Sequence, residues 1–378
     1  MRRPAGTLPR PSCCVEAGIP EDDIASRCGA ATRTTVECAA VAVAFGPYRV
    51  FEALGIGGMA TVNRAEITVQ GAVYEVALKC LDPELARDRT FVRRFIAEAR
   101  LGQLLKHPNI ARTHEVGCID DTHFIAFEWV PGVTALQVFE LARDTSPPPV
   151  YITLRIVTQV ARALAYAHDL RDENGQKVGL IHRDIAPSNI IVGDNGTTKL
   201  IDFGVAKSTL AHVNTVAGEV IGKLGYVAPE YLKTGKCDIR ADVYALGVIA
   251  WELLTGRRLF EAETLDAAEA QRFAPFDPPS NLNPHVPPEL DEIIRLSLTA
   301  SPGKRWQTAA DFADALEKLT DQAGLAIRDE DVAAWVIAEF GEPMRRKIRA
   351  RTADIESDVD LDIEQTFGRL RARTEPVS

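Results

Sequence analysis

The stretch IHRDIAPSNIIV (181–192) decides how this sequence is interpreted, together with the tripeptide DFG (202–204) that follows it. The stretch lies between a long helical pattern and a short apolar run, which indicates a loop that connects a helix to a strand. An acid, Asp184, stands five residues before an amide, Asn189, and a second acid, Asp202, follows. In this arrangement one carboxylate can orient a hydroxyl nucleophile, while the amide and the other carboxylate hold Mg²⁺ on a polyphosphate.

A glycine-rich segment, LGIGGMATV (54–62), lies between two expected strands. Glycines allow the backbone to approach a ligand where a Cβ atom would obstruct it, although such loops also form ordinary hairpins. This loop opens a strand, whereas the dinucleotide-binding fingerprint opens a helix. Lys79 ends the apolar run VALK (76–79), where a lysine needs an anionic partner, and Glu98 on the next expected helix is the candidate.

The expected secondary structure divides the chain into two unequal parts. Strands are expected at 48–54, 61–69, 73–81, 110–119 and 122–130, with one helix at 89–106. The short turns between the first strands permit only an antiparallel meander. Apolar residues then follow helical spacing after 150 and at 240–256, 288–298 and 307–319. We therefore expect an α+β fold in which a small antiparallel sheet with one helix is joined, near 129–132, to a larger helical lobe.

With GYVAPE (225–230) added, these motifs resemble those of the protein kinase superfamily in type, order and spacing. Because GGMA occurs in the glycine loop, the chain is similar to bacterial Hanks-type serine/threonine kinases. The resemblance covers residues 48–319, with an N-lobe at 48–130 and a C-lobe at 131–319. It implies a two-lobed protein-kinase-like fold and a signalling enzyme that uses ATP and Mg²⁺ to phosphorylate Ser or Thr hydroxyls of protein substrates.

The resemblance also assigns roles to the matching residues. Asp184 would be the catalytic base, Asn189 and Asp202 the magnesium ligands, and Lys79 would hold the α- and β-phosphates while paired with Glu98. Phe127 would be the gatekeeper before the hinge (128–130), whose backbone would bond adenine. The residues expected around ATP are Leu54, Gly55, Ile56, Gly57, Gly58, Met59, Ala60, Thr61, Val62, Ala77, Lys79, Glu98, Glu128 and Val130.

Other matching residues are interpreted as structural. His182 and Phe203 would pack in the spine that connects the lobes, and Asp242 would bond the backbone of the catalytic loop. Glu230 and Arg305 would form a buried ion pair, in which the loss of either partner leaves an uncompensated charge.

One departure from the family pattern concerns charge at the reaction centre. Serine/threonine kinases usually carry lysine two residues after the catalytic acid, but here Ala186 stands there, and Gly222-Lys223 replaces the usual Gly-Thr pair. Tyrosine kinases often have alanine at this position, but their loop continues without the equivalent of Pro187. We predict that Lys223 is a catalytic residue that restores the missing charge near Asp184. The alternative is that Lys223 points to solvent or substrate and activity is merely lower.

Autophosphorylation is expected between DFG and Gly222, where the hydroxyls are Ser208, Thr209 and Thr215. Arg183 directly precedes the catalytic acid, where related kinases use an arginine to bind a phosphate on this segment.

Two other classes of function remain as alternatives. A pseudokinase, which would serve as a binding or scaffold module, is favoured only by the missing lysine at 186. A small-molecule phosphotransferase of the aminoglycoside-kinase type shares the acid-and-amide loop, but such enzymes lack the segment that corresponds to VAPEYL (227–232).

Composition limits the remaining possibilities. The 378 residues include 43 Lys and Arg against 53 Asp and Glu, a net charge of −10 that does not favour nucleic-acid binding. The longest fully apolar run, CAAVAVAF (38–45), is too short to span a membrane, and seven scattered cysteines without a CxxC pair favour the cytoplasm. We expect residues 1–47 to be a disordered leader and residues 320–378 to be a partly helical charged tail. Nothing in the sequence indicates an oligomeric state.

Overall fold

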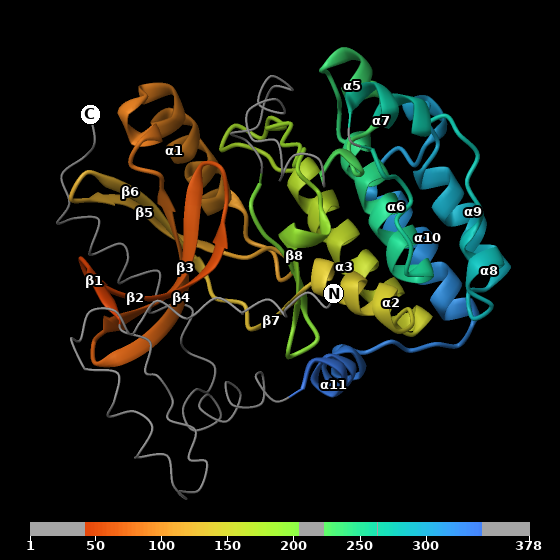
Figure 1. The fold of residues 1–378 in the computed structure, drawn as a ribbon, viewed down its shortest axis with the longest axis horizontal. Helices are drawn as coiled ribbons and strands as arrows, with labels where there is room; N and C mark the ends of the chain where they lie inside the picture. Colours follow the sequence, from red (N-terminus) through yellow and green to blue (C-terminus); the bar gives the residue numbers. More distant parts are fainter. Residues whose placement is uncertain (1–41, 204–222, 263, 342–378) are drawn as a thin grey trace, which may run out of the picture. The chain divides into compact units, whose positions relative to one another are not determined.

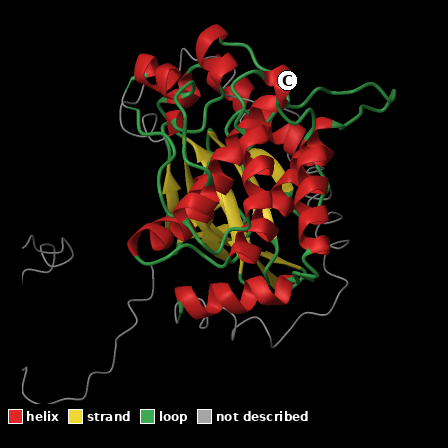
Figure 2. Ribbon diagram, turned by 90° about the vertical axis from the view of Figure 1, so that its right-hand side faces the viewer, coloured by secondary structure: helices red, strands yellow, loops and turns green. Residues whose placement is uncertain are grey.

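The computed structural model describes residues 42–203, 223–262 and 264–341. In this part of the chain a sheet-rich lobe with one helix is followed by a helical lobe, which confirms the expected two-lobed α+β fold (Figure 1). Viewed from the helical lobe, the helices lie in front of the strands (Figure 2). The predicted phosphorylation sites Ser208, Thr209 and Thr215 lie outside the described residues.

The N-lobe contains a six-stranded antiparallel sheet with the order β1-β2-β3-β4-β6-β5. Its strands are β1 (Val43–Phe45), β2 (Tyr48–Ile56), β3 (Ala60–Val69), β4 (Ala72–Leu81), β5 (Thr113–Ile119) and β6 (Thr122–Glu128). Two-residue turns close three of its hairpins, and in two of them, Gln70-Gly71 and Asp120-Asp121, both residues have the positive φ angles that favour such turns.

The sheet begins earlier than the sequence indicated. The prediction of a disordered leader to residue 47 is wrong at its end, because β1 pairs with β2 in the register Val43↔Val50 to Phe45↔Tyr48. The ring of Phe45 packs edge-on against Phe124 at 5.7 Å between centroids. A three-residue strand is too short for an alternating pattern to reveal it.

Helix α1 (Arg89–Leu104) lies beside the sheet and contacts β5. The side chain of Asp88 caps its first turn by accepting a hydrogen bond from the Thr90 amide at 2.7 Å. The helix buries Phe95, Glu98 and Ala99. Because Glu98 is buried, its carboxylate must be paired.

The C-lobe combines a small sheet with a bundle of helices. The sheet has the order β7-β8-β9, formed by β7 (Gly132–Thr134), β8 (Ile190–Gly193) and β9 (Thr198–Leu200). The helices are α2 (Ala135–Asp144), α3 (Val150–His168), α5 (Pro229–Thr234), α6 (Arg240–Thr255), α7 (Leu265–Gln271), α8 (Pro279–Leu282), α9 (Pro288–Ser297), α10 (Ala309–Gln322) and α11 (Asp329–Phe340). Among the described helices, none is both long and apolar enough to cross a membrane.

Helices α3 and α6 form the centre of the C-lobe core. Helix α6 is buried from Ala241 to Thr255, in agreement with an apolar sequence that has little amphipathic character. Its buried Asp242 and Glu252 both bind groups of the candidate site.

The expected tail contains a helix that packs on the C-lobe. Helix α11 contacts α3, β7 and β8, and its Val332 and Val336 are fully buried in the main core. The backbone of Asp329 approaches so closely that a Cβ atom at Gly196 would lie 1.8 Å from its carbonyl oxygen. This part of the tail is therefore integral to the lobe.

Candidate active site

The loop that begins with His182 is fixed by a buried carboxylate on α6. The amides of His182 and Arg183 donate to the two carboxylate oxygens of Asp242 at 2.8 and 2.9 Å, and the ring of His168 bonds the same group at 2.8 Å. Burial raises the pKa of Asp242, but hydrogen bonding to His168 and the nearby histidines outweigh it and hold the pKa below its ordinary value. The carboxylate thus remains charged where it holds the loop.

Asp184 and Asn189 form one unit within this loop. The turn Pro187–Asn189 folds the chain back, so the Asn189 side-chain nitrogen donates to the carbonyl of Asp184 at 2.7 Å and to its Oδ2 at 2.8 Å. These bonds use the amide nitrogen of Asn189 and orient its oxygen for other ligands. The Asp184 carboxylate is thereby held in a defined orientation.

Lys79 joins three elements across the two lobes. Its Nζ lies 2.7 Å from Oε1 of Glu98 on α1 and 2.8 Å from Oδ1 of Asp202, which follows β9. Burial lowers the pKa of Lys79, but the Asp202 and Glu98 carboxylates outweigh it, so the pKa lies above its ordinary value. Glu98 is thus the anionic partner that the sequence predicted for Lys79.

Two site residues have strained backbones. Arg183 and Asp202 have φ angles of 62° and 55°, and the other non-glycine residues with positive φ in the described chain are the hairpin residues Gln70, Asp120 and Asp121. Left-handed conformations outside turns are costly and concentrate at functional sites. The two strained residues lie in the two motifs that the sequence singled out, the loop 181–192 and the DFG tripeptide 202–204.

The glycine loop is a hairpin between β2 and β3. Gly55 and Ile56 pair with Val62 and Thr61, and the Gly57 amide donates to the Ala60 carbonyl at 3.0 Å. A Cβ atom at Gly55 would meet nothing within 4 Å, and one at Gly57 would lie 3.6 Å from the Ala60 oxygen. Packing within the protein therefore does not require glycine at either position, and the open space suits a ligand.

The hinge region lies at the end of β6. Ala77, on the same strand as Lys79, pairs with Phe127 on β6, and Val130 is buried. The Glu128 carboxylate is bound by Lys199 at 2.8 Å and by the Arg112 amide at 3.1 Å. The Glu128 side chain therefore has a structural role, and only its backbone suits the predicted contact with adenine.

Lys223 enters the site from a distant part of the chain. Its Nζ lies 2.9 Å from Asp184 Oδ2. The contact agrees with the predicted placement of a positive charge beside Asp184, and the catalytic role of Lys223 stays a prediction.

The residues interpreted as structural take the expected positions. Arg305 is buried and bonds both carboxylate oxygens of Glu230 at 2.9 and 3.0 Å. The rings of His182 and Phe203 pack against each other at a tilt of 48°, with centroids 4.6 Å apart. These contacts support the loop and the start of α5.

Metal coordination would rest on few protein groups. Within the described ranges, no cluster of three or more His, Cys, Asp or Glu side chains is arranged to hold a metal. The Asn189 amide and the Asp202 carboxylate supply oxygen donors, which suit Mg²⁺ when a nucleotide completes its coordination.

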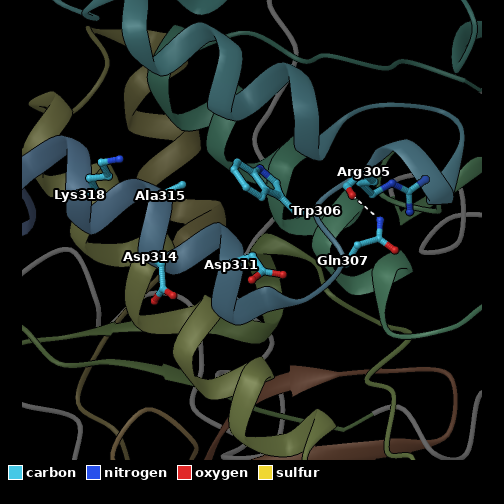
Figure 3. A pocket seen from close by; sticks show the side chains of 7 residues that line it. All are labelled: Arg305, Trp306, Gln307, Asp311, Asp314, Ala315 and Lys318. Atoms are coloured by element: carbon cyan, nitrogen blue, oxygen red, sulfur yellow. Dashed lines mark hydrogen bonds between the residues drawn. The ribbon is translucent and has the colours of Figure 1, made fainter.

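A surface hollow on the C-lobe contains none of the predicted site residues. It has a volume of about 430 Å³ and is lined by Arg305, Trp306, Gln307, Asp311, Asp314, Ala315 and Lys318 on the C-lobe (Figure 3). Two of its acids already have partners, since Asp311 caps α10 and Asp314 pairs with Arg162. It therefore has no feature of an active site.

The chain is similar to known proteins in both sequence and structure. A family model described as "Protein kinase domain" matches residues 48–317. The chain is 36% identical to the tyrosine-protein kinase MasK of Myxococcus xanthus over 79% of this chain and 47% of that protein. It is 33% identical to the serine/threonine-protein kinase PrkC of Bacillus subtilis over 71% of this chain and 39% of that protein.

The solved kinase domain of PknI from Mycobacterium tuberculosis is also similar. It superposes with a TM-score of 0.54 and 31% identity, over 74% of this chain and 98% of that domain. The chain spans less than half the length of the two curated relatives described above.

Proposed function

The chain belongs to the protein kinase domain family, and from this premise we propose that it transfers the γ-phosphoryl group of ATP to serine or threonine hydroxyls of proteins. The family uses ATP and a divalent metal in general, and we propose Mg²⁺ as the metal. We further propose that the chain phosphorylates itself and acts in the cytoplasm. The free thiols of Cys80, Cys118 and Cys237 support that location.

The observation that carries this proposal is the bridge formed by Lys79. Its ammonium group contacts carboxylates from α1 and from the segment after β9, residues 19 and 123 positions away in the chain. Kinases require such a lysine–glutamate pair and an aspartate in place at the same time. Lys79 would then hold the phosphates of ATP beside the glycine loop.

Asp202 and Asn189 would hold the magnesium ion. Bound there, the ion would neutralise the phosphate oxygens. Lys79 already contacts the Asp202 carboxylate, so it keeps one of its oxygens at a defined position. The Asn189 amide nitrogen is used by Asp184, which orients its oxygen for the metal.

Asp184 would act as the base. Its side chain is only 12% exposed and is fixed by Asn189, so it can orient a substrate hydroxyl and accept its proton. The hydroxyl oxygen forms a bond to the γ-phosphorus, while the bond from that phosphorus to the leaving oxygen of ADP breaks. Most of the catalysis in such a site comes from positioning and charge stabilisation.

The class of hydroxyl is the finer part of this proposal. The names of the two curated relatives differ, one being a tyrosine-protein kinase and the other a serine/threonine-protein kinase. Pro187 in the catalytic loop supports Ser and Thr, because the loop of tyrosine kinases continues differently.

Labelled ATP distinguishes these possibilities. The full chain is incubated with ATP labelled in the γ-phosphate, with and without Mg²⁺, and with generic protein substrates or aminoglycosides. We expect Mg²⁺-dependent label on protein, recovered as phosphoserine or phosphothreonine after hydrolysis. Label on phosphotyrosine alone would contradict the hydroxyl class, label only on the small molecule would identify a different phosphotransferase, and ATP binding without any transfer would identify a pseudokinase.

A further inference from the structure

The carboxylate of Asp184 is shared by two donors. Asn189 Nδ2 lies 2.8 Å from Oδ2, and Lys223 Nζ lies 2.9 Å from the same oxygen. Lys223 stands 39 residues after Asp184, so its charge arrives from outside the catalytic loop. An ammonium group at this distance from the base is also close to the position where the phosphoryl group must be transferred.

Hydrogen bonds from a buried arginine hold the backbone that follows Lys223 in place. The buried guanidinium of Arg272, which is 4% exposed, donates to the carbonyls of Leu224 and Val227. Since these carbonyls belong to the turn that starts at Lys223, Arg272 helps to fix the position of the Lys223 backbone. Leu224 is itself buried, at 4% exposure.

A second arginine fixes the same turn. The Tyr226 hydroxyl donates to Glu252 on α6 at 2.7 Å, and Arg258 pairs with that carboxylate at 3.0 Å. The Tyr226 amide also donates to the Lys223 carbonyl at 3.1 Å. The backbone of Lys223 is therefore held by the C-lobe, while its side chain is 34% exposed and pairs with Asp184.

The catalytic loop does not supply this charge two residues after the base. Ala186 is buried at 3% exposure and presents only a methyl group. Charge on the transferred phosphoryl group is spread over its oxygens in the transition state, where a fixed cation is worth more than in water. Lys223 places such a positive charge in direct contact with Asp184.

Building on the proposed function, we propose that Lys223 is a catalytic residue that stabilises the transferred phosphoryl group. While the substrate hydroxyl bonds to the γ-phosphorus and gives its proton to Asp184, the bond to ADP breaks. Lys223 stays protonated throughout, and its four-carbon stem allows the ammonium to pass from the Asp184 oxygen to a phosphoryl oxygen.

Three substitutions separate charge from packing. Lys223→Met keeps most of the stem but removes the charge, Lys223→Ala removes both, and Lys223→Arg keeps the charge. We expect the Met and Ala variants to lose at least tenfold in kcat, about 1.4 kcal/mol, with the KM for ATP within about twofold of wild type. The Arg variant should retain more turnover than either, and exposed Lys233→Ala on α5 serves as the matched control.

The double variant Ala186→Lys/Lys223→Met tests whether a lysine at position 186 can replace the positive charge that is lost from position 223. A lysine two residues after Asp184 should recover part of the lost kcat, provided that the thermal midpoint shows a folded protein. Turnover of Lys223→Met within twofold of wild type would overturn the role of Lys223 and leave the proposed function intact. A wild-type chain that transfers no phosphoryl group would instead overturn the proposed function, and this inference with it.

Discussion

At the scale of single residues, the site depends on buried charges that compensate one another, so the loss of one leaves its partners unpaired. Lys79 is held by two carboxylates, so its replacement removes the phosphate-binding cation and leaves Glu98 and Asp202 facing each other without it. Glu98 is buried, which makes this arrangement sensitive to the loss of one charge.

Lys79→Met should therefore lose phosphoryl transfer by a factor of about 100 or more, or about 3 kcal/mol, while the protein stays folded. The measurement is the initial rate of label transfer from ATP, with circular dichroism as the check on folding. Lys177→Met is the control, because Lys177 pairs with Asp169 on the exposed surface. A Lys79→Met rate above half of the wild-type rate would refute the role of this lysine.

Asp202→Asn tests the proposed metal ligand. The amide keeps the size of the side chain and one oxygen but loses the charge, so the Mg²⁺ concentration for half-maximal rate should rise severalfold. Asp120→Asn is a matched control, since Asp120 also has a positive φ but lies in an exposed hairpin turn. An unchanged Mg²⁺ requirement in Asp202→Asn would argue against metal binding there.

At the scale of elements, the catalytic loop could be predicted from sequence because its function imposes its residues. The acid and amide need one fixed spacing, and the structure brings Asp184 and Asn189 together as that spacing implied. The contact between Lys223 and Asp184 was also predicted, from the pair of exchanged residues. The anchors Arg272 and Arg258 could not be predicted, because Arg272 binds backbone carbonyls and Arg258 binds the Tyr226 hydroxyl, groups that lie near them only after folding.

The segment between DFG and Gly222 should acquire phosphate. We expect autophosphorylation within Ser208 to Thr215, because added negative charge there can pair with Arg183. Mass-spectrometric mapping after incubation with Mg²⁺ and ATP tests this, with Asp184→Asn as the inactive control. Phosphate found only outside 205–222 would exclude this segment as the site.

At the scale of the whole molecule, α11 extends the C-lobe beyond the residues matched by the kinase family. Asp329 Oδ1 accepts hydrogen bonds from Arg155 Nε at 2.9 Å and from Gln159 Nε2 at 2.7 Å. Gln159 in turn accepts from Asn109, in the connection between α1 and β5, at 3.0 Å. The sequence indicated a partly helical charged tail but not that it packs on the lobe, because the burial of Val332 and Val336 becomes visible only in the folded structure.

Removing the anchors of α11 should destabilise the catalytic lobe. Asp329→Ala loses several bonds to partly buried groups and should cost about 1–2 kcal/mol, and Val332→Asp should cost more because it buries a charge. Thermal unfolding measures both, and Glu339→Ala at an exposed position on the same helix is the control. An unchanged midpoint in both variants would show that α11 does not contribute to stability.

The central claim is that Asp184 is the base of a phosphoryl-transfer site, and Asp184→Asn tests it most directly. The amide retains the size of the side chain and its bond from Asn189 but cannot accept the substrate proton. Transfer of the γ-phosphoryl group and binding of Mg²⁺-ATP are measured on the same preparation. We expect binding of Mg²⁺-ATP within a few-fold of wild type and phosphoryl transfer lowered at least about 100-fold. Transfer close to the wild-type rate, with the protein folded and ATP bound, would contradict this claim.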